Sequence, residues 1–199
     1  MSLPYYQQFG WDAEVLTVKN PDIDTPLDHS LVKSIPAHTI VHYIKTFTKK
    51  FTSKIGLGSI ALRSLYFYKK AGNELLKTGD YQLVFFSTTQ FPLCILGSYW
   101  KKKHNIPYVI DMQDPWHSDY YEDKPKHQRP PKYWLSYTLN KFLEPIAMKS
   151  VDGLIAVSDK YITDLKSRYP NINNIPAAVV TAVGAFGVKQ VGGTVTFTV

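Results

Sequence analysis

The stretch Pro107-Tyr-Val-Ile-Asp-Met-Gln-Asp-Pro-Trp-His117 decides the fold that this sequence predicts. Its first half is a short apolar run, which is typical of a strand buried in a parallel sheet. Its second half changes abruptly to two carboxylates, an amide, a proline, a tryptophan and a histidine. Ligands of open α/β sheets bind beyond the carboxyl ends of the strands, so the stretch predicts a core strand that ends in a site. The alternative is a plain turn capped by Asp114, with Trp116 covering the edge of the core.

Strands and helices are predicted to alternate on both sides of this stretch. Short apolar runs predict strands at residues 14–18, 81–86 and 153–157. Helical spacing of apolar residues predicts helices at residues 40–51, 59–79, 92–104, 133–150 and 159–168. The alternation predicts the α/β class, with a Rossmann-like, mostly parallel sheet flanked by helices and joined by right-handed crossovers.

Polar residues follow three of the predicted strands, at Ser87-Thr88-Thr89, from Asp111 to Asp114, and at Ser158-Asp159. Because the carboxyl ends of parallel strands lie along one edge of a sheet, we expect these residues to converge on a single crevice. Within this set Asp111 is expected to be a buried structural carboxylate. His117, just beyond it, is expected to be a solvent-exposed loop residue rather than a base.

Length and composition bound the class of protein. A chain of 199 residues predicts one ordinary domain, and a hydrophobic content of 44% is enough to build a core. The single cysteine, Cys94, excludes an internal disulfide and lies in an apolar run, so we expect a small core residue. Neither a secretory signal nor an apolar stretch of membrane-spanning length is visible, which predicts a cytoplasmic protein, possibly peripheral on the inner face of the membrane.

The formal net charge of +7 favours an anionic partner. The basic residues form short clusters without a zinc-finger, RNP or KH signature, so nucleic acid is not expected to be the partner. An anionic membrane surface stays an alternative, because Tyr and Trp interleave with Lys in the stretch 117–132. The chain also lacks a phosphate-binding P-loop, a nucleophile elbow and a metal-ligand spacing, so no metal and no cofactor are predicted.

Residues 176–199 differ from the rest of the chain, since Lys189 is their only charged residue. We therefore predict a Rossmann-like domain at residues 1–174 and an atypical tail at 175–199. The tail is interpreted either as a truncated or frameshifted linker or as a hairpin around Gly192-Gly193.

Four segments in order carry a family resemblance: Gly10-Trp-Asp-Ala-Glu-Val-Leu-Thr17, Asp80-Tyr-Gln-Leu-Val-Phe-Phe-Ser87, Lys103 to Trp116, and Val151-Asp-Gly-Leu-Ile-Ala-Val-Ser158. Over about residues 9–174 the chain resembles the acceptor-side, N-terminal domain of GT-B glycosyltransferases of the glycosyltransferase-4-like group. The resemblance implies a retaining, metal-independent transfer of a sugar from a nucleotide-sugar to a saccharide or lipid-linked acceptor. The donor would be held by a C-terminal domain that this chain lacks, and the family's first strand and glycine-rich loop have no counterpart here.

The resemblance also implies roles for residues at the predicted sheet edge. Gln113 or Asp114 matches the family position beside the transferred sugar, and Asp114 would accept the hydrogen bond of the acceptor hydroxyl or act as a base. Its alternative is an Asx-turn ahead of Pro115. The other expected substrate contacts are Ser87, Thr88, Trp116, His117 and Ser158, with ordinary packing as the alternative for Trp116 and a helix cap for Ser158.

Two functions thus stay open at this stage. The first is the acceptor domain of a glycosyltransferase, inactive without its donor domain. The second is a non-catalytic Rossmann-like module that binds an anionic ligand or a membrane surface.

Overall fold

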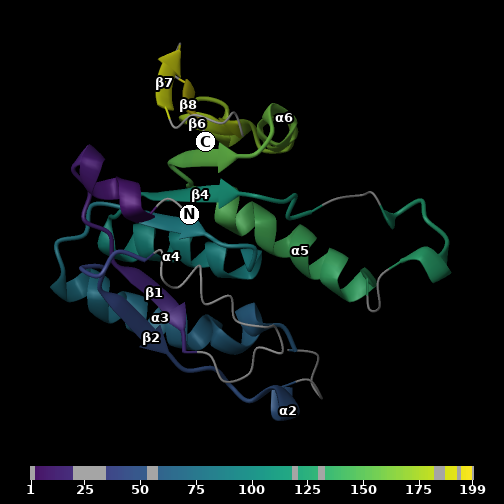
Figure 1. The fold of residues 1–199 in the computed structure, drawn as a ribbon. Helices are drawn as coiled ribbons and strands as arrows, with labels where there is room; N and C mark the ends of the chain where they lie inside the picture. Colours follow the sequence, from purple (N-terminus) through teal and green to yellow (C-terminus); the bar gives the residue numbers. More distant parts are fainter. Residues whose placement is uncertain are drawn as a thin grey trace. The chain divides into compact units, whose positions relative to one another are not determined.

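The computed structural model describes residues 3–19, 35–52, 58–117, 121–129, 133–181, 187–191 and 194–198, without the side chains of residue 51 and of residues from 181 onward. The chain divides into two compact units, Met1–Leu75 and Leu76–Val199. Each unit is described by itself, with the elements as they are labelled in Figure 1.

The first unit holds a small parallel sheet and a long helix. Its elements are η1 (Leu3–Phe9), β1 (Val15–Val18), β2 (Val41–Ile44), α2 (Lys49–Thr52) and α3 (Ile60–Thr78), the last of which continues across the unit boundary. β1 and β2 pair in parallel over their whole length. Ser59 begins α3, because its Oγ accepts a hydrogen bond from the backbone N–H of Leu62 at 3.3 Å.

The helix predicted at residues 40–51 is wrong. Residues 41–44 form β2 instead, and only Lys49–Thr52 are helical. The two β-branched residues of β2, Val41 and Ile44, suit a strand as well as a helix face, and pairing with β1 satisfies the backbone groups of this segment. Pairing with β1 therefore determines that this segment is a strand, although its apolar spacing is compatible with both a helix and a strand.

The second unit is a parallel sheet whose strands alternate with helices (Figure 1). Its helical elements are η3 (Phe91–Cys94), α4 (Ile95–His104), η5 (Lys126–Gln128), α5 (Tyr133–Met148), α6 (Asp159–Arg168) and η6 (Pro170–Ile172). Its strands are β3 (Val84–Ser87), β4 (Tyr108–Met112), β5 (Gly153–Ala156), β6 (Ala177–Thr181), β7 (Gly187–Val191) and β8 (Thr194–Thr198). The four strands β3-β4-β5-β6 are neighbours in this order and all parallel. The predicted α/β, Rossmann-like class is confirmed.

The strand of the opening stretch, β4, is paired on both sides, with β3 and with β5. Tyr108, Ile110 and Met112 of β4 are all buried, in the alternation that a pleated strand produces. Tyr108 donates a hydrogen bond from its hydroxyl to the carbonyl oxygen of Ala147 at 2.5 Å, which ties β4 to α5. Cys94 is fully buried, as predicted for a core residue, and burial raises the pKa of its thiol to about 12.

The chain enters β4 through a left-handed residue that ends α4. Asn105 has φ 58°, and its backbone N–H returns to the carbonyl oxygen of Lys101 at 2.9 Å. Asn tolerates this conformation better than most residues, and Pro107 two positions later prevents the helix from continuing. The end of the predicted helix 92–104 is therefore confirmed.

Part of the predicted tail belongs to the sheet. β6 pairs in parallel with β5, β8 pairs in parallel with β6, and β7 pairs antiparallel with β8. An antiparallel neighbouring pair is what a hairpin produces, but Gly192 and Gly193 lie outside the described residues. The domain boundary at residue 174 stays a prediction. No helix in the described ranges is both long and apolar enough to cross a membrane.

Candidate functional site

The carboxyl ends of β3 and β4 bring two of the expected polar residues together. The strand register places Ser87 beside Asp111. Ser87 Oγ donates a hydrogen bond to Asp111 Oδ2 at 3.1 Å. These residues are 24 positions apart in the sequence, so their contact depends on the parallel pairing of the two strands. The expected convergence of polar residues at this edge is therefore present between β3 and β4.

Gln113 completes a three-residue group, which we call the edge triad (Ser87, Asp111 and Gln113). Its Nε2 donates a hydrogen bond to the same Asp111 Oδ2 at 3.1 Å. Side chains at positions i and i+2 of an extended segment lie on the same side, so the Gln113 side chain can reach Asp111. Asp111 is only partly covered, and Ser87 and Gln113 are exposed. The expectation of a buried structural Asp111 is therefore wrong.

Asp114 follows the edge triad on the exposed turn before Pro115. Because Asp114 is exposed, a ligand can reach it without rearrangement of the core. Together with Asp111 it gives the edge a locally acidic character within a chain of net charge +7. Its role as a base and its role in an Asx-turn both stay predictions.

Thr88 and Ser158 hold local structure with their hydroxyl oxygens. Thr88 Oγ1 accepts a hydrogen bond from the backbone N–H of Gln90 at 3.0 Å. Ser158 Oγ accepts one from the backbone N–H of Lys160 at 3.2 Å and so caps α6, which confirms the capping alternative for Ser158. Each hydroxyl keeps its proton for donation, so neither residue loses all capacity to contact a ligand.

Trp116 is part of the core and not of the exposed edge. Its side chain is 4% exposed, and its ring stacks on Phe91 with centroids 5.6 Å apart. Its Nε1 donates to Asn140 Oδ1 at 3.1 Å, which satisfies the indole N–H inside the protein. The packing alternative therefore accounts for Trp116. Of the neighbouring tyrosines, Tyr121 lies against Tyr133, and Tyr120 is outside the described residues.

His117 is buried, so its expected position in solvent is wrong. The side chain packs against Tyr137 with ring centroids 4.8 Å apart. Its Nδ1 lies 4.0 Å from Oε2 of Glu144, whose side chain is also buried. His117, which follows Pro115-Trp116 beyond the end of β4, therefore packs against α5.

Glu144 is the residue that the sequence prediction missed. Its Oε2 accepts hydrogen bonds from Arg168 Nη1 at 2.5 Å and from the Tyr169 hydroxyl at 2.9 Å. We call Glu144, Arg168, Tyr169 and His117 the buried acid cluster. Glu144 shares the buried face of α5 with Leu143, Ala147 and Met148, but apolar spacing alone does not distinguish this face from the exposed one that carries Phe142 and Ile146.

The pKa values in the buried acid cluster follow from burial and from the Glu144 charge. Burial raises the pKa of the Tyr169 hydroxyl, and the Glu144 carboxylate raises it further. For Arg168, burial acts to lower the pKa, but the neighbouring Glu144 outweighs it and the pKa is raised. The raised pKa values keep the Arg168 guanidinium and the Tyr169 hydroxyl protonated. Both groups can therefore donate hydrogen bonds to Glu144 and connect α5 to the end of α6.

In the described part of the chain no three metal-binding side chains come together in a way that would hold an ion. The edge triad offers hydrogen-bond donors and acceptors instead, and the buried acid cluster uses its donors internally. Comparison with family models, with curated proteins and with solved structures finds no match to this chain.

Proposed function

We propose that this chain binds the acceptor sugar for a GT-B type glycosyltransferase, on the exposed carboxyl edge of its parallel sheet. The observation that carries the proposal is the convergence of Ser87 and Gln113 on the carboxylate of Asp111. This edge is where open α/β sheets bind ligands. The resemblance to the acceptor-side domain of the glycosyltransferase-4-like group supports the same placement.

The chemistry of the edge triad suits a saccharide. Sugar hydroxyls both donate and accept hydrogen bonds, and they are best recognised by groups of fixed geometry that do the same. Asp111 uses Oδ2 for its two partners and retains acceptor capacity on Oδ1. Gln113 retains its amide oxygen, so the triad offers acceptors for at least two sugar hydroxyls.

Sugar transfer requires an acceptor oxygen to form a bond with the anomeric carbon of the donor. The bond from that carbon to the diphosphate oxygen breaks, and the nucleoside diphosphate leaves with its electron pair. The proton of the acceptor hydroxyl passes to a base, a role we assign to Asp114, or to the departing phosphate oxygen. The edge triad contributes by holding the acceptor in place, and a second domain, implied by the resemblance, would hold the donor.

The alternative of a module that binds an anionic ligand fits this edge less well. Asp111 and Asp114 both place a carboxylate there, and like charges repel an anion. A neutral saccharide meets no such repulsion. The basic residues of the chain therefore need a different explanation, which lies on another surface.

Saturation-transfer NMR with the methyl glycosides of glucose, galactose, mannose and N-acetylglucosamine tests the proposal. At least one glycoside should bind, and Asp111→Asn should weaken its binding by about tenfold, because a hydrogen bond to a charged group contributes about 1.5–3 kcal/mol. Asp164→Asn, which alters an exposed carboxylate on α6, is the matched control and should leave binding unchanged. UDP-glucose and GDP-mannose should not bind to this chain alone. Binding of a nucleotide-sugar, or equal glycoside binding by Asp111→Asn, would count against the proposal.

A further inference from the structure

Helix α5 presents an apolar face to solvent, although it also packs on the core. The exposed fractions along this face are 71% for Trp134, 68% for Phe142, and 37% each for Leu135 and Ile146. The residues recur at helical spacing, so they form one stripe rather than scattered single positions. We call these four residues the α5 stripe. Apolar side chains gathered on one exposed stripe mark an interaction surface, whereas single exposed ones do not.

The opposite side of α5 explains why the stripe is not the core face. Leu143, Ala147 and Met148 are buried there, together with Glu144. The Glu144–Arg168 hydrogen bond fixes the rotation of α5 about its own axis, since a buried carboxylate cannot leave its partner without a large cost. The helix therefore cannot turn to hide Trp134 and Phe142 and keep this pair.

Lysines predominate among the exposed charges on and beside α5, where Glu122 is the acid that accepts a hydrogen bond from the Tyr137 hydroxyl at 3.3 Å. Lys141 and Lys149 are exposed beside the stripe. Glu144 is the only acid of α5 and is neutralised inside the protein by Arg168. Helix α4 lies next to α5, where Ser98 Oγ donates to the carbonyl oxygen of Ile146 at 2.6 Å (Figure 1). Lys102 and Lys103, in the last turn of α4, are exposed and add positive charge to this pair of helices.

The sequence suggested the stretch 117–132 as a membrane contact, and its described part at residues 121–129 is less suitable. It carries the exposed acids Glu122 and Asp123 among its basic residues. Arg129 donates its guanidinium hydrogen bonds to the carbonyl oxygens of Lys124 and Glu122, within the same stretch. The coherent combination of apolar and basic side chains therefore belongs to α5.

We propose that α5 docks on an anionic lipid surface, with Trp134 and Phe142 inserted at the level of the headgroups. Lysines that flank an apolar helix face attract anionic headgroups, and aromatic side chains favour the interface between water and hydrocarbon. A second copy of the chain is a poorer occupant, because it would bring two lysine-flanked stripes together. This docking goes beyond sugar binding and does not rest on it.

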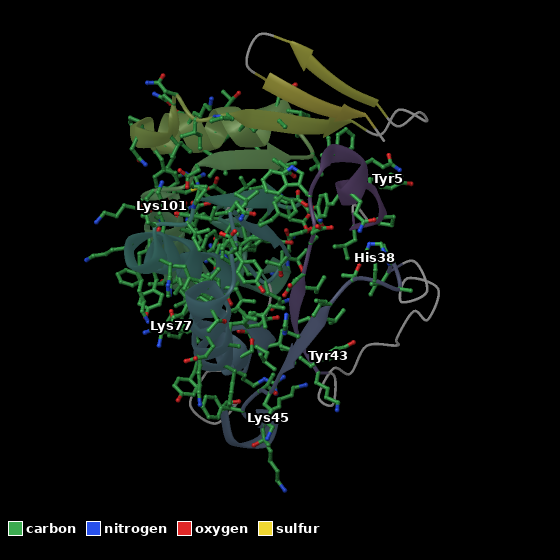
Figure 2. The ribbon with its side chains drawn as sticks, turned by 90° about the vertical axis from the view of Figure 1, so that its left-hand side faces the viewer. Tyr5, His38, Tyr43, Lys45, Lys77 and Lys101 are labelled. Carbon is green, nitrogen blue, oxygen red and sulfur yellow. The ribbon has the colours of Figure 1, made fainter. Side chains whose placement is uncertain are left out.

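Co-sedimentation with lipid vesicles tests the docking on the full chain. The vesicles contain phosphatidylcholine alone or with phosphatidylglycerol, at low and at high salt. Two double variants alter the surface: Trp134→Ser/Phe142→Ser removes the aromatic anchors, and Lys141→Glu/Lys149→Glu reverses the flanking charge. Two control variants make the same kinds of change at other surface positions. Tyr43→Ser/Tyr66→Ser removes aromatic side chains that are 62% and 58% exposed. Lys45→Glu/Lys77→Glu reverses two lysine charges, and Figure 2 labels Tyr43, Lys45 and Lys77.

The parent chain should bind only the vesicles with phosphatidylglycerol, and more weakly at high salt. Both α5 variants should bind at least about tenfold more weakly, and both controls within about twofold of the parent. The proposal fails if the parent does not bind, if the α5 variants bind as the parent does, or if the controls lose as much. It also fails if sedimentation without lipid reveals a dimer that Trp134→Ser/Phe142→Ser dissociates. An unchanged thermal unfolding temperature for each variant shows that its loss of vesicle binding does not result from unfolding.

Discussion

Arg168 Nη1 donates a hydrogen bond to Oε2 of Glu144 at 2.5 Å and so joins the last turn of α6 to α5. The two residues differ in exposure, since the side chain of Glu144 is 2% exposed and that of Arg168 is 35% exposed. Glu144 is therefore the residue whose charge must be stabilised by its partner, because water does not reach it. This asymmetry makes the two residues unequal when either is replaced.

Arg168→Ala should destabilise the fold more than Glu144→Gln does. Loss of Arg168 leaves a buried carboxylate without its cation, which costs about 3–5 kcal/mol where burial is complete. Glu144→Gln leaves an amide that still accepts a hydrogen bond from Tyr169, and Arg168 can turn to solvent, so about 1–2 kcal/mol is expected. Denaturant unfolding measures both. Lys160→Ala, which removes an exposed pair with Asp164, is the control and should change stability by less than about 0.5 kcal/mol.

Ser158→Ala should destabilise α6 through loss of its N-cap. The Ser158 hydroxyl satisfies the N–H of Lys160, and removal of such a cap costs about 1 kcal/mol, whereas Ser158→Gly costs only a few tenths. Thermal unfolding of the two variants checks this difference. Ser136→Ala, at an exposed position inside α5, serves as the control and should have little effect. Equal losses for the Ala and Gly variants would contradict a capping role.

Cys94 should resist thiol reagents in the folded protein. Its pKa is raised from 9.0 to about 12 by burial, so thiolate is scarce and inaccessible at pH 8. Because the folded pKa is the higher one, the contribution of Cys94 to stability is complete below pH 9 and is lost as pH rises toward 12. The rate of reaction with a disulfide reagent should follow global unfolding as denaturant is added. Complete labelling within the mixing time, without denaturant, would exclude the buried position.

Gly97→Ala should destabilise the contact between α4 and β4. A Cβ at Gly97 would overlap the ring of Tyr108, a fully buried side chain. Overpacking of this kind costs about 1–3 kcal/mol, which more than offsets the higher helix propensity of Ala. Denaturant unfolding measures the loss. In a Tyr108→Leu background, which removes the ring, Gly97→Ala should cost less than it does in the parent. A Gly97→Ala variant as stable as the parent would contradict the close contact between Gly97 and Tyr108.

The sequence predicts β3, β4 and β5 of the second unit well because each of these strands is a short apolar run bounded by turns, whereas β6, β7 and β8 lie in the segment that it predicts as a tail. β3, β4 and β5 and the helices between them follow the predicted ranges closely, and Asn105 and Ser158 end and begin helices as expected. The segment at Val41–Ile44 was predicted as a helix because its apolar spacing fits both periods. Only its pairing with Val15–Val18, more than twenty residues away, decides the strand.

The sequence predicts only part of the candidate site, because the burial of its residues depends on parts of the chain far away in the sequence. Alternation along one strand gives the side on which a residue lies, but not how deeply the edge of the sheet is covered. Alternation therefore predicts a buried Asp111 and an exposed His117, whereas in the structure Asp111 is partly exposed and His117 is buried. The partner that buries His117 is Glu144, 27 positions later on α5, and no local pattern connects the two.

The central claim, that the edge triad binds a sugar, is tested most directly by mapping that contact in solution. A ¹⁵N-labelled chain is titrated with the methyl glycoside that binds best, and the amide and side-chain signals are followed by NMR. The largest shifts are expected at Ser87, at Asp111 and at the Nε2 group of Gln113, and Asp111→Asn should abolish them. Shifts confined to residues away from the carboxyl ends of β3 and β4, or shifts that persist in Asp111→Asn, would contradict the account.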